Sequence, residues 1–259
     1  MNLASKSVVL GLLLTFSVAT LPAFAVEPAK PNQAANQTTT PKESPFCTNL
    51  SATVSKVNTN VTNLKAKITS SFAQRDSEIA SNRAKWDQEI KDNRAKWDKV
   101  RQDNFTKLET KAQTDAQKAA VKTYESAITN AVTTRRAAYD AARVTYRGAE
   151  DGAIAAKRDK INGQIANFTN GVNGAISTAQ ASCAATPSNG PAIRDKFSAD
   201  MKAAGDTYSQ DRKNDDIGST LKQLAQTRNA AFAAADKTFD ATAQAARDAL
   251  KAAFKGASI

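Results

Sequence analysis

The sequence predicts an all-α protein built around a long antiparallel helical hairpin that a disulfide closes. Three observations lead to this fold class. After residue 46 the chain is rich in Ala, Lys, Asp, Arg and Gln, its apolar residues recur at helical spacing, and strand-like runs are scarce. No proline occurs between Cys47 and Cys183, so nothing there forces a helix to break. Each cysteine lies 68 residues from Asp115, which gives a chain that folds back at Asp115 two arms of equal length.

Residues 1–25 are predicted to be a secretory signal peptide. Lys6 gives a positive start, residues 8–18 are largely apolar, and Ala23 and Ala25 occupy the two positions that a signal peptidase reads. The apolar run is short for a membrane span, and an anchor that is never cleaved is the alternative. We therefore expect an exported protein with no transmembrane span after cleavage, located in the periplasm, on the cell surface or outside the cell. An oxidising compartment favours a disulfide over two free thiols.

Residues 26–46 are expected to form a disordered tether. Asn, Gln and Thr separate its four prolines, which are Pro28, Pro31, Pro41 and Pro45. A segment of this composition buries too little apolar surface to offset the entropy of ordering it.

The segment from Cys47 to Cys183 is predicted to form the hairpin, with its turn near residues 113–116. Thr114 followed by Gln117 has the pattern of a capping box, which opens a new helix. Folding back at this point brings the two cysteines together, so we expect a disulfide within one chain. A bridge between two chains is the alternative.

Both arms carry apolar stripes of the kind that pair in a coiled coil. Heptad spacing covers the start of the first arm, at Leu50, Val54, Val57, Val61, Leu64 and Ile68. After Phe72 the spacing changes to eleven-residue repeats, and the two repeats that start at Arg83 and Arg94 both begin Arg-Ala-Lys-Trp-Asp. With Asp115 as the midpoint, we expect the apolar residues of the first arm to face a similar stripe between residues 161 and 176 of the second.

Residues 184–259 are predicted to add two further helices that pack on the hairpin. A Pro-Ser-Asn-Gly-Pro segment precedes the first, and Asp215 or Asp216 is expected to cap the second. Each helix has one apolar stripe, which we expect to cover the polar part of the hairpin. The alternative for residues 217–254 is an amphipathic helix that lies on a membrane surface.

A basic, aromatic stretch of the first arm is the candidate binding surface. The chain carries a net charge of +11, spread over its length and strongest in this arm. Such a surface attracts anionic polymers, which include nucleic acid, cell-wall polyanions and anionic lipid head groups. Its residues are Arg83, Lys85, Trp86, Arg94, Lys96, Trp97, Lys99 and Arg101.

The tryptophans of this surface have both a binding and a structural interpretation. The eleven-residue spacing puts Trp86 and Trp97 on one helix face, where they could stack on bases or sugar rings. The apolar period, however, places both on the buried side, and we expect them to pack there.

The charges of this arm have a structural interpretation as well. Asp87 precedes Lys91 by four residues, and Asp92 precedes Lys96 by the same spacing. Acidic and basic side chains at this spacing pair on one helix face. We therefore expect these charges to pair within the helix and to leave a solvated face.

The composition argues against most catalytic chemistry. The chain has no histidine, which removes the usual catalytic triads and histidine metal sites. Its two cysteines are too far apart for a CxxC redox pair. We therefore expect no enzyme, no metal and no cofactor. A hydrolase that uses carboxylates alone is the alternative, since Glu150-Asp151 and Asp215-Asp216 are adjacent pairs.

With two cysteines that bracket Arg-Ala-Lys-Trp-Asp repeats, residues 46–255 resemble a group of uncharacterised exported helical-hairpin proteins of small-genome bacteria. This resemblance implies no assigned activity. The long helical arms are also similar to those of periplasmic holdase chaperones, although those proteins trimerise through a β-rich body that this sequence does not encode. We expect a non-catalytic structural or binding protein of the cell envelope. A holdase for unfolded proteins is the alternative, and self-association is compatible with both.

Overall fold

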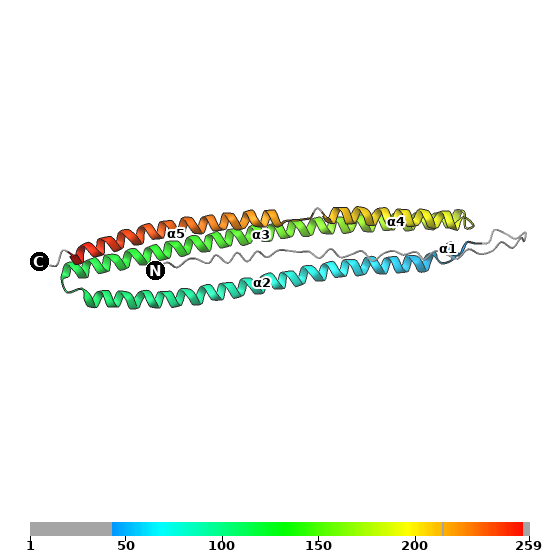
Figure 1. Ribbon diagram of the computed structural model, residues 1–259. Helices are drawn as coiled ribbons and strands as arrows, with labels where there is room; N and C mark the ends of the chain where they lie inside the picture. Colours follow the sequence, from blue (N-terminus) through cyan, green and yellow to red (C-terminus); the bar gives the residue numbers. More distant parts are fainter. Residues whose placement is uncertain (1–42, 214, 256–259) are drawn as a thin grey trace, which may run out of the picture. The chain divides into compact units, whose positions relative to one another are not determined.

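The computed structural model describes residues 43–213 and 215–255, and all regular structure in them is α-helical. The helices, shown in Figure 1, are α1 (Pro45–Thr48), α2 (Leu50–Lys111), α3 (Asp115–Ala185), α4 (Gly190–Lys213) and α5 (Gly218–Lys255). A disulfide joins Cys47 to Cys183, so the predicted all-α class and the predicted bridge are both confirmed. Among the described residues, no helix is long and apolar enough to cross a membrane. The predicted signal peptide and the tether up to residue 42 lie outside the described residues.

The connection between α2 and α3 has the capping box that the sequence predicts. The Gln117 side-chain oxygen accepts hydrogen bonds from the backbone N–H groups of Gln113 at 2.9 Å and Thr114 at 3.2 Å. In return, the Thr114 hydroxyl oxygen accepts from the Gln117 N–H at 3.2 Å. These bonds satisfy amide donors that the start of a helix otherwise leaves without partners. The chain therefore stops one helix and begins the next within a few residues, for a reason that is local to the sequence.

The chain divides into two compact units, and α2 and α3 contribute to both. The first unit contains the described residues up to Arg75 together with Ala155–Ile217, which includes α4. The second contains Asp76–Ile154 together with the described residues from Gly218 onward, which form α5.

The first unit has a dense apolar centre, which we call the base core. It draws on α2, α3 and α4, and two of its α3 side chains, Ile161 and Val172, are 0% exposed. The heptad residues of α2 lie in it with the α3 stripe that the sequence places opposite them. Its buried members include Val57, Val61, Leu64, Ile68, Ile161, Ile165, Phe168, Val172, Ile176, Phe197 and Met201. Full burial of one such side chain contributes about 1.5–3 kcal/mol before entropy is subtracted.

The last residues of the predicted tether are structured, which corrects its boundary. The Ser44 N–H donates to the Pro187 carbonyl at 2.8 Å, and the Ser44 hydroxyl accepts from the Cys47 N–H at 3.3 Å as the N-cap of α1. The Phe46 ring centroid lies 6.0 Å from that of Phe197. Proline composition alone suggested disorder here, whereas a cap and a ring contact to α4 hold the segment in place.

Replacing Gly190 with alanine is expected to destabilise this contact. A Cβ at Gly190 would lie 2.0 Å from the Ser44 Oγ and 2.3 Å from the Ser44 Cβ, so Ser44 and α1 would have to move. We expect a loss of about 1–3 kcal/mol in the free energy of unfolding, measured in urea. The matched control is Gly174→Ala, because a Cβ there meets nothing within 4 Å. That change should stabilise the helix by about 0.5–1 kcal/mol, and equal effects of the two substitutions would contradict the contact.

The second unit has a smaller apolar centre. Among the described residues, the buried members of this cluster are Phe105, Ile128 and Ala243, one from each of α2, α3 and α5. Arginines of α3 and α5 also lie against aromatic rings of the other helix, for example Arg228, whose Cζ lies 4.6 Å from the ring centroid of Tyr146. Such contacts supply attraction where aliphatic side chains are few.

A buried carboxylate lies in the first unit, at the break that follows α4. The Asp215 side chain is only 3% exposed and lies 2.9 Å from the Lys160 Nζ and 3.2 Å from the Arg212 Nη1. The Gln164 side-chain amide also donates to it at 3.0 Å. The sequence offers Asp215 as a cap for α5, but the structure places its carboxylate among side chains of α3 and α4 instead.

Candidate binding surface on α2

The candidate residues, all on α2 in the second unit, fall into two groups. The arginines form ion pairs, whereas the tryptophans and all three lysines are exposed to solvent. Arg101 pairs with Asp98 of its own helix at 2.6 Å, and Lys99 lies 3.6 Å from Asp103. The arginines therefore bind carboxylates of the protein, whereas the exposed tryptophans and lysines face solvent.

Four of the ion pairs that connect α2 with α3 follow a regular spacing, and we call these four the ladder; Arg83 also pairs with Glu150 of α3 at 2.6 Å. Steps of four, seven and four residues along α2 are matched by equal steps backward along α3, as expected for antiparallel helices that keep one register. The pairs are Arg83–Asp151 at 2.8 Å and Asp87–Arg147, Arg94–Asp140 and Asp98–Arg136, each at 2.7 Å. Every guanidinium in the ladder donates two hydrogen bonds to its carboxylate.

The same short pattern on both helices produces the ladder. In α2, an Arg stands four residues before an Asp twice, eleven residues apart, and α3 repeats this arrangement from Arg136 to Asp151. Sequence reasoning identified the first set and missed the second. It also assigned the carboxylates wrongly, because Asp87 binds Arg147 rather than a lysine of its own helix, and Asp92 accepts from the Gln88 amide at 2.8 Å. A bidentate hydrogen bond from an arginine of the other helix is stronger than a solvated lysine–carboxylate pair within one helix.

The ladder shifts the titration of its carboxyl groups. The hydrogen bond from Arg136 lowers the pKa of Asp98 to about 2, with Arg101 assisting. The hydrogen bond from Arg147 lowers the pKa of Asp87, and the hydrogen bond from Arg94 lowers the pKa of Asp140. All three carboxylates are about half exposed, so water and salt screen each pair and its contribution to stability is small.

Acidification should weaken the ladder in a defined range of pH. Because the folded pKa of Asp98 lies below the ordinary value of 3.8, its contribution is complete above about pH 4 and disappears as the pH falls toward 2. We expect Asp98→Asn to cost at most about 1 kcal/mol near pH 6, and this cost should shrink toward zero near pH 2. Urea unfolding of both proteins across this range measures it, with Asp103→Asn as the control. A loss of unfolding free energy in Asp98→Asn that does not change with pH would contradict a stabilising ion pair at Asp98.

Trp86 and Trp97 are 42% and 50% exposed, so the expectation that they pack on the buried side is wrong. We call the eight residues that form the ladder its rungs. Trp86 comes one residue before the rung Asp87, and Trp97 one residue before the rung Asp98. One residue is a rotation of about 100° around a helix, so the rungs occupy the contact with α3 and the tryptophans lie beside it.

The rungs of α3 show on which side of the pair the tryptophans lie. Tyr139 comes one residue before the rung at Asp140, and its hydroxyl donates to Asp236 of α5 at 2.6 Å. Tyr146 likewise precedes the next rung, and its ring lies against Arg228 of α5. In antiparallel right-handed helices, positions one residue before the rungs fall on the same side of the pair. The tryptophans of α2 therefore lie on the side of the ladder where α5 packs.

An exposed lysine precedes each tryptophan. Lys85 and Lys96 form no salt bridge with any residue that the structure describes, whereas Arg83 and Arg94 are committed to α3. The cationic part of the surface is thus reduced to lysines. We call Lys85, Trp86, Lys96 and Trp97 the Trp–Lys surface.

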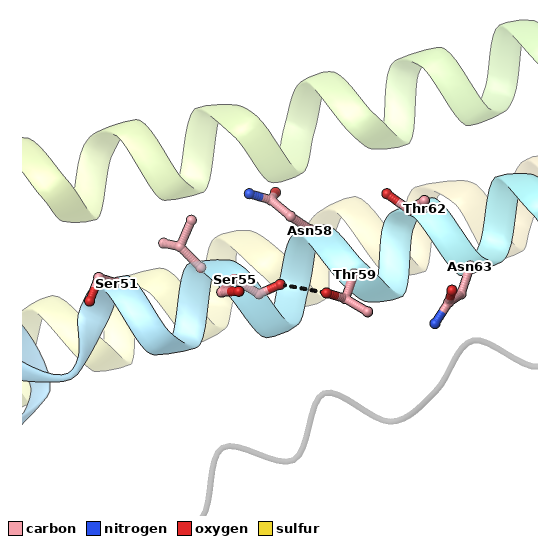
Figure 2. A pocket seen from close by; sticks show the side chains of 7 residues that line it. Ser51, Ser55, Asn58, Thr59, Thr62 and Asn63 are labelled. Atoms are coloured by element: carbon pink, nitrogen blue, oxygen red, sulfur yellow. Dashed lines mark hydrogen bonds between the residues drawn. The ribbon is translucent and has the colours of Figure 1, made fainter.

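The first unit has an open cavity on another part of α2, of about 500 Å³. Its lining is uncharged and consists of Ser51, Val54, Ser55, Asn58, Thr59, Thr62 and Asn63. Figure 2 shows that Thr59 bonds to Ser55, with its hydroxyl donating to the Ser55 carbonyl at 3.0 Å. The polar groups of this lining are hydroxyls and side-chain amides. Within the described ranges, no group of three or more Cys, Asp or Glu residues could hold a metal ion.

No protein-family model matches the chain, and comparisons with curated proteins and with solved structures also give no match.

Proposed function

We propose that this chain is a non-catalytic, exported structural and binding protein of the cell envelope, and that α2 contacts anionic polymers through the Trp–Lys surface. One observation carries the proposal. Two half-exposed tryptophans lie eleven residues apart on one helix face, and each follows an exposed lysine without a described salt bridge. The predicted signal peptide and the disulfide support export.

The scaffold of this surface is proposed to be an antiparallel, coiled-coil-like hairpin of α2 and α3. The capping box at Thr114, the ladder and the disulfide support this arrangement. In it, the ladder uses the arginines to hold the helices together and leaves the lysines and tryptophans for a ligand.

The surface predicts a specific mode of binding. Eleven residues of helix span about 16 Å, so the two indoles would stack at two separated points of an extended polymer. Stacking on an aromatic side chain contributes about 1–3 kcal/mol per base and tolerates any sequence. Because the arginines are occupied, only two or three lysines would neutralise phosphates. We therefore expect a shallow salt dependence, with a slope of log K against log salt of about −2 on a single strand.

Tryptophan fluorescence tests the proposal directly, because Trp86 and Trp97 are the two tryptophans of the chain. Single-stranded DNA, a soluble cell-wall polyanion and vesicles with an anionic lipid should be titrated separately at low salt. Quenching by at least one of them, with the shallow slope above, supports the proposal. No change in fluorescence with any of the three would contradict it.

Substitutions separate the two components of the surface. Lys85→Ala with Lys96→Ala should weaken binding and flatten the salt slope, and Trp86→Ala with Trp97→Ala should weaken binding without changing that slope. The double tryptophan variant has to be followed by filter binding or calorimetry. The matched control is Lys202→Ala, an exposed lysine of α4 in the other unit.

A holdase chaperone is the second candidate, because the second unit also exposes apolar side chains. Val100 is 39% and Val144 is 71% exposed there, in addition to the tryptophans. Exposed apolar surface of this kind binds unfolded chains. Suppression of the aggregation of an unfolded client at equimolar ratio, insensitive to salt, would favour the holdase over the polyanion-binding protein.

A further inference from the structure

The ladder uses a charge pattern that does not distinguish one copy of the chain from another. Along α2 the order of rung charges is plus, minus, plus, minus from Arg83 to Asp98. Along α3 it is also plus, minus, plus, minus from Arg136 to Asp151, and antiparallel pairing matches every plus with a minus. Nothing in these four pairs requires α2 and α3 to come from the same molecule.

The disulfide restricts this pairing to one molecule. It joins residues 136 positions apart, and the loop it closes contains all of α2, the turn and α3 as far as Cys183. A closed loop could exchange α2 with a second copy only by threading one chain through the other. The turn itself is short, and its capping bonds at Thr114 and Gln117 stay within the start of α3, so α3 would keep its cap if the turn opened.

We propose that, once the disulfide is reduced, α2 of one chain pairs with α3 of a second copy, giving an exchanged dimer in which both ladders are complete. The reduction is by a dithiol, which delivers two electrons and two protons. The S–S bond breaks, Cys47 and Cys183 become thiols, and the reductant becomes a disulfide. The partner of this interface is thus the chain itself, and exchange of an identical element is a common route to dimers. The inference goes beyond polyanion binding and does not depend on it.

Charge-reversed chains test the proposal. The first variant reverses the α2 rungs with Arg83→Asp, Asp87→Arg, Arg94→Asp and Asp98→Arg, and the second reverses the α3 rungs with Arg136→Asp, Asp140→Arg, Arg147→Asp and Asp151→Arg. Each alone sets like charges against each other. In an exchanged heterodimer the reversed α2 meets the reversed α3, and the two wild-type helices meet each other. Mixing the reduced variants should therefore give a dimer with about twice the monomer mass by light scattering.

Reoxidation fixes the result covalently. In the exchanged dimer, Cys47 of each chain lies beside Cys183 of the other, so reoxidation of the mixture should give a dimer on a non-reducing gel. Either variant alone, and a mixture that was never reduced, should give much less. Folding of every sample is checked by circular dichroism. Equal dimer yields from the mixture and from one variant alone, or no dimer from folded chains, would overturn the proposal.

The wild-type chain provides a test that does not depend on the folding of the variants. Isotopically heavy and light chains are mixed, reduced, refolded at increasing concentration and reoxidised. Mass spectrometry should find a heavy Cys47 peptide linked to a light Cys183 peptide, in a fraction that rises with concentration. Absence of this mixed pair at every concentration would overturn the proposal.

Discussion

Replacing both Cys47 and Cys183 with serine should lower the free energy of unfolding by about 4–5 kcal/mol. The bridge joins positions 136 residues apart, and closing so long a loop removes much conformational entropy from the unfolded chain. Serine is close to cysteine in size, so the substitution removes the bond with little change in volume. A loss of this size is a large fraction of the roughly 5–15 kcal/mol by which an ordinary folded domain is stable.

The measurement is urea unfolding of the oxidised protein, the reduced protein and the double serine variant. The reduced protein and the variant should agree with each other. Both should also show a steeper dependence on urea, because an unfolded chain without the cross-link exposes more surface. Ser70→Ala, at an exposed position of α2, is the control for serine chemistry in a helix. A difference below about 1 kcal/mol between the oxidised and reduced proteins would contradict the entropic account.

The features that the sequence predicted correctly are those with a local cause. The capping box needs only Thr114 and Gln117, which are three residues apart, and it appears as expected. The base core follows from apolar spacing in two segments that are rich in large aliphatic residues. The short α1 was missed although Ser44 as its N-cap and Pro45 at its start are local signals. Its packing depends on contacts between residues far apart in the sequence, namely Ser44 against Gly190 and a phenylalanine ring against α4.

The ion pairs of the second unit were harder to predict than the apolar contacts of the base core. Charges at helical spacing can pair within a helix or between helices, and only the register of α2 against α3 decides. Symmetry about Asp115 places Arg94 opposite Arg136, whereas the structure pairs Arg94 with Asp140, about one helical turn away. The exposure of the tryptophans follows from the same cause, since charged rungs rather than apolar residues occupy the contact with α3.

Asp215→Asn should be the most damaging single change of a charged residue, with a loss of about 3 kcal/mol in the free energy of unfolding. Its carboxylate is 3% exposed and is shared by Lys160, Gln164 and Arg212, of which Arg212 is only 9% exposed. Asparagine keeps the shape but removes the charge, so the buried guanidinium loses this counterion. Nearby burial also lowers the pKa of Lys157, which indicates that cations in this region are poorly solvated.

A double-mutant cycle separates the ion pair from the fold around it. Removing one partner of a buried pair leaves the other charge stranded, whereas removing both does not. Arg212→Met should therefore restore part of the stability when it is combined with Asp215→Asn, with a coupling energy of about 1–3 kcal/mol. The control is Asp195→Asn, since Asp195 is exposed and pairs only with its neighbour Arg194 among the described residues, and it should change stability by less than about 0.5 kcal/mol. If Asp215→Asn costs no more than this control, the carboxylate does not stabilise the break between α4 and α5.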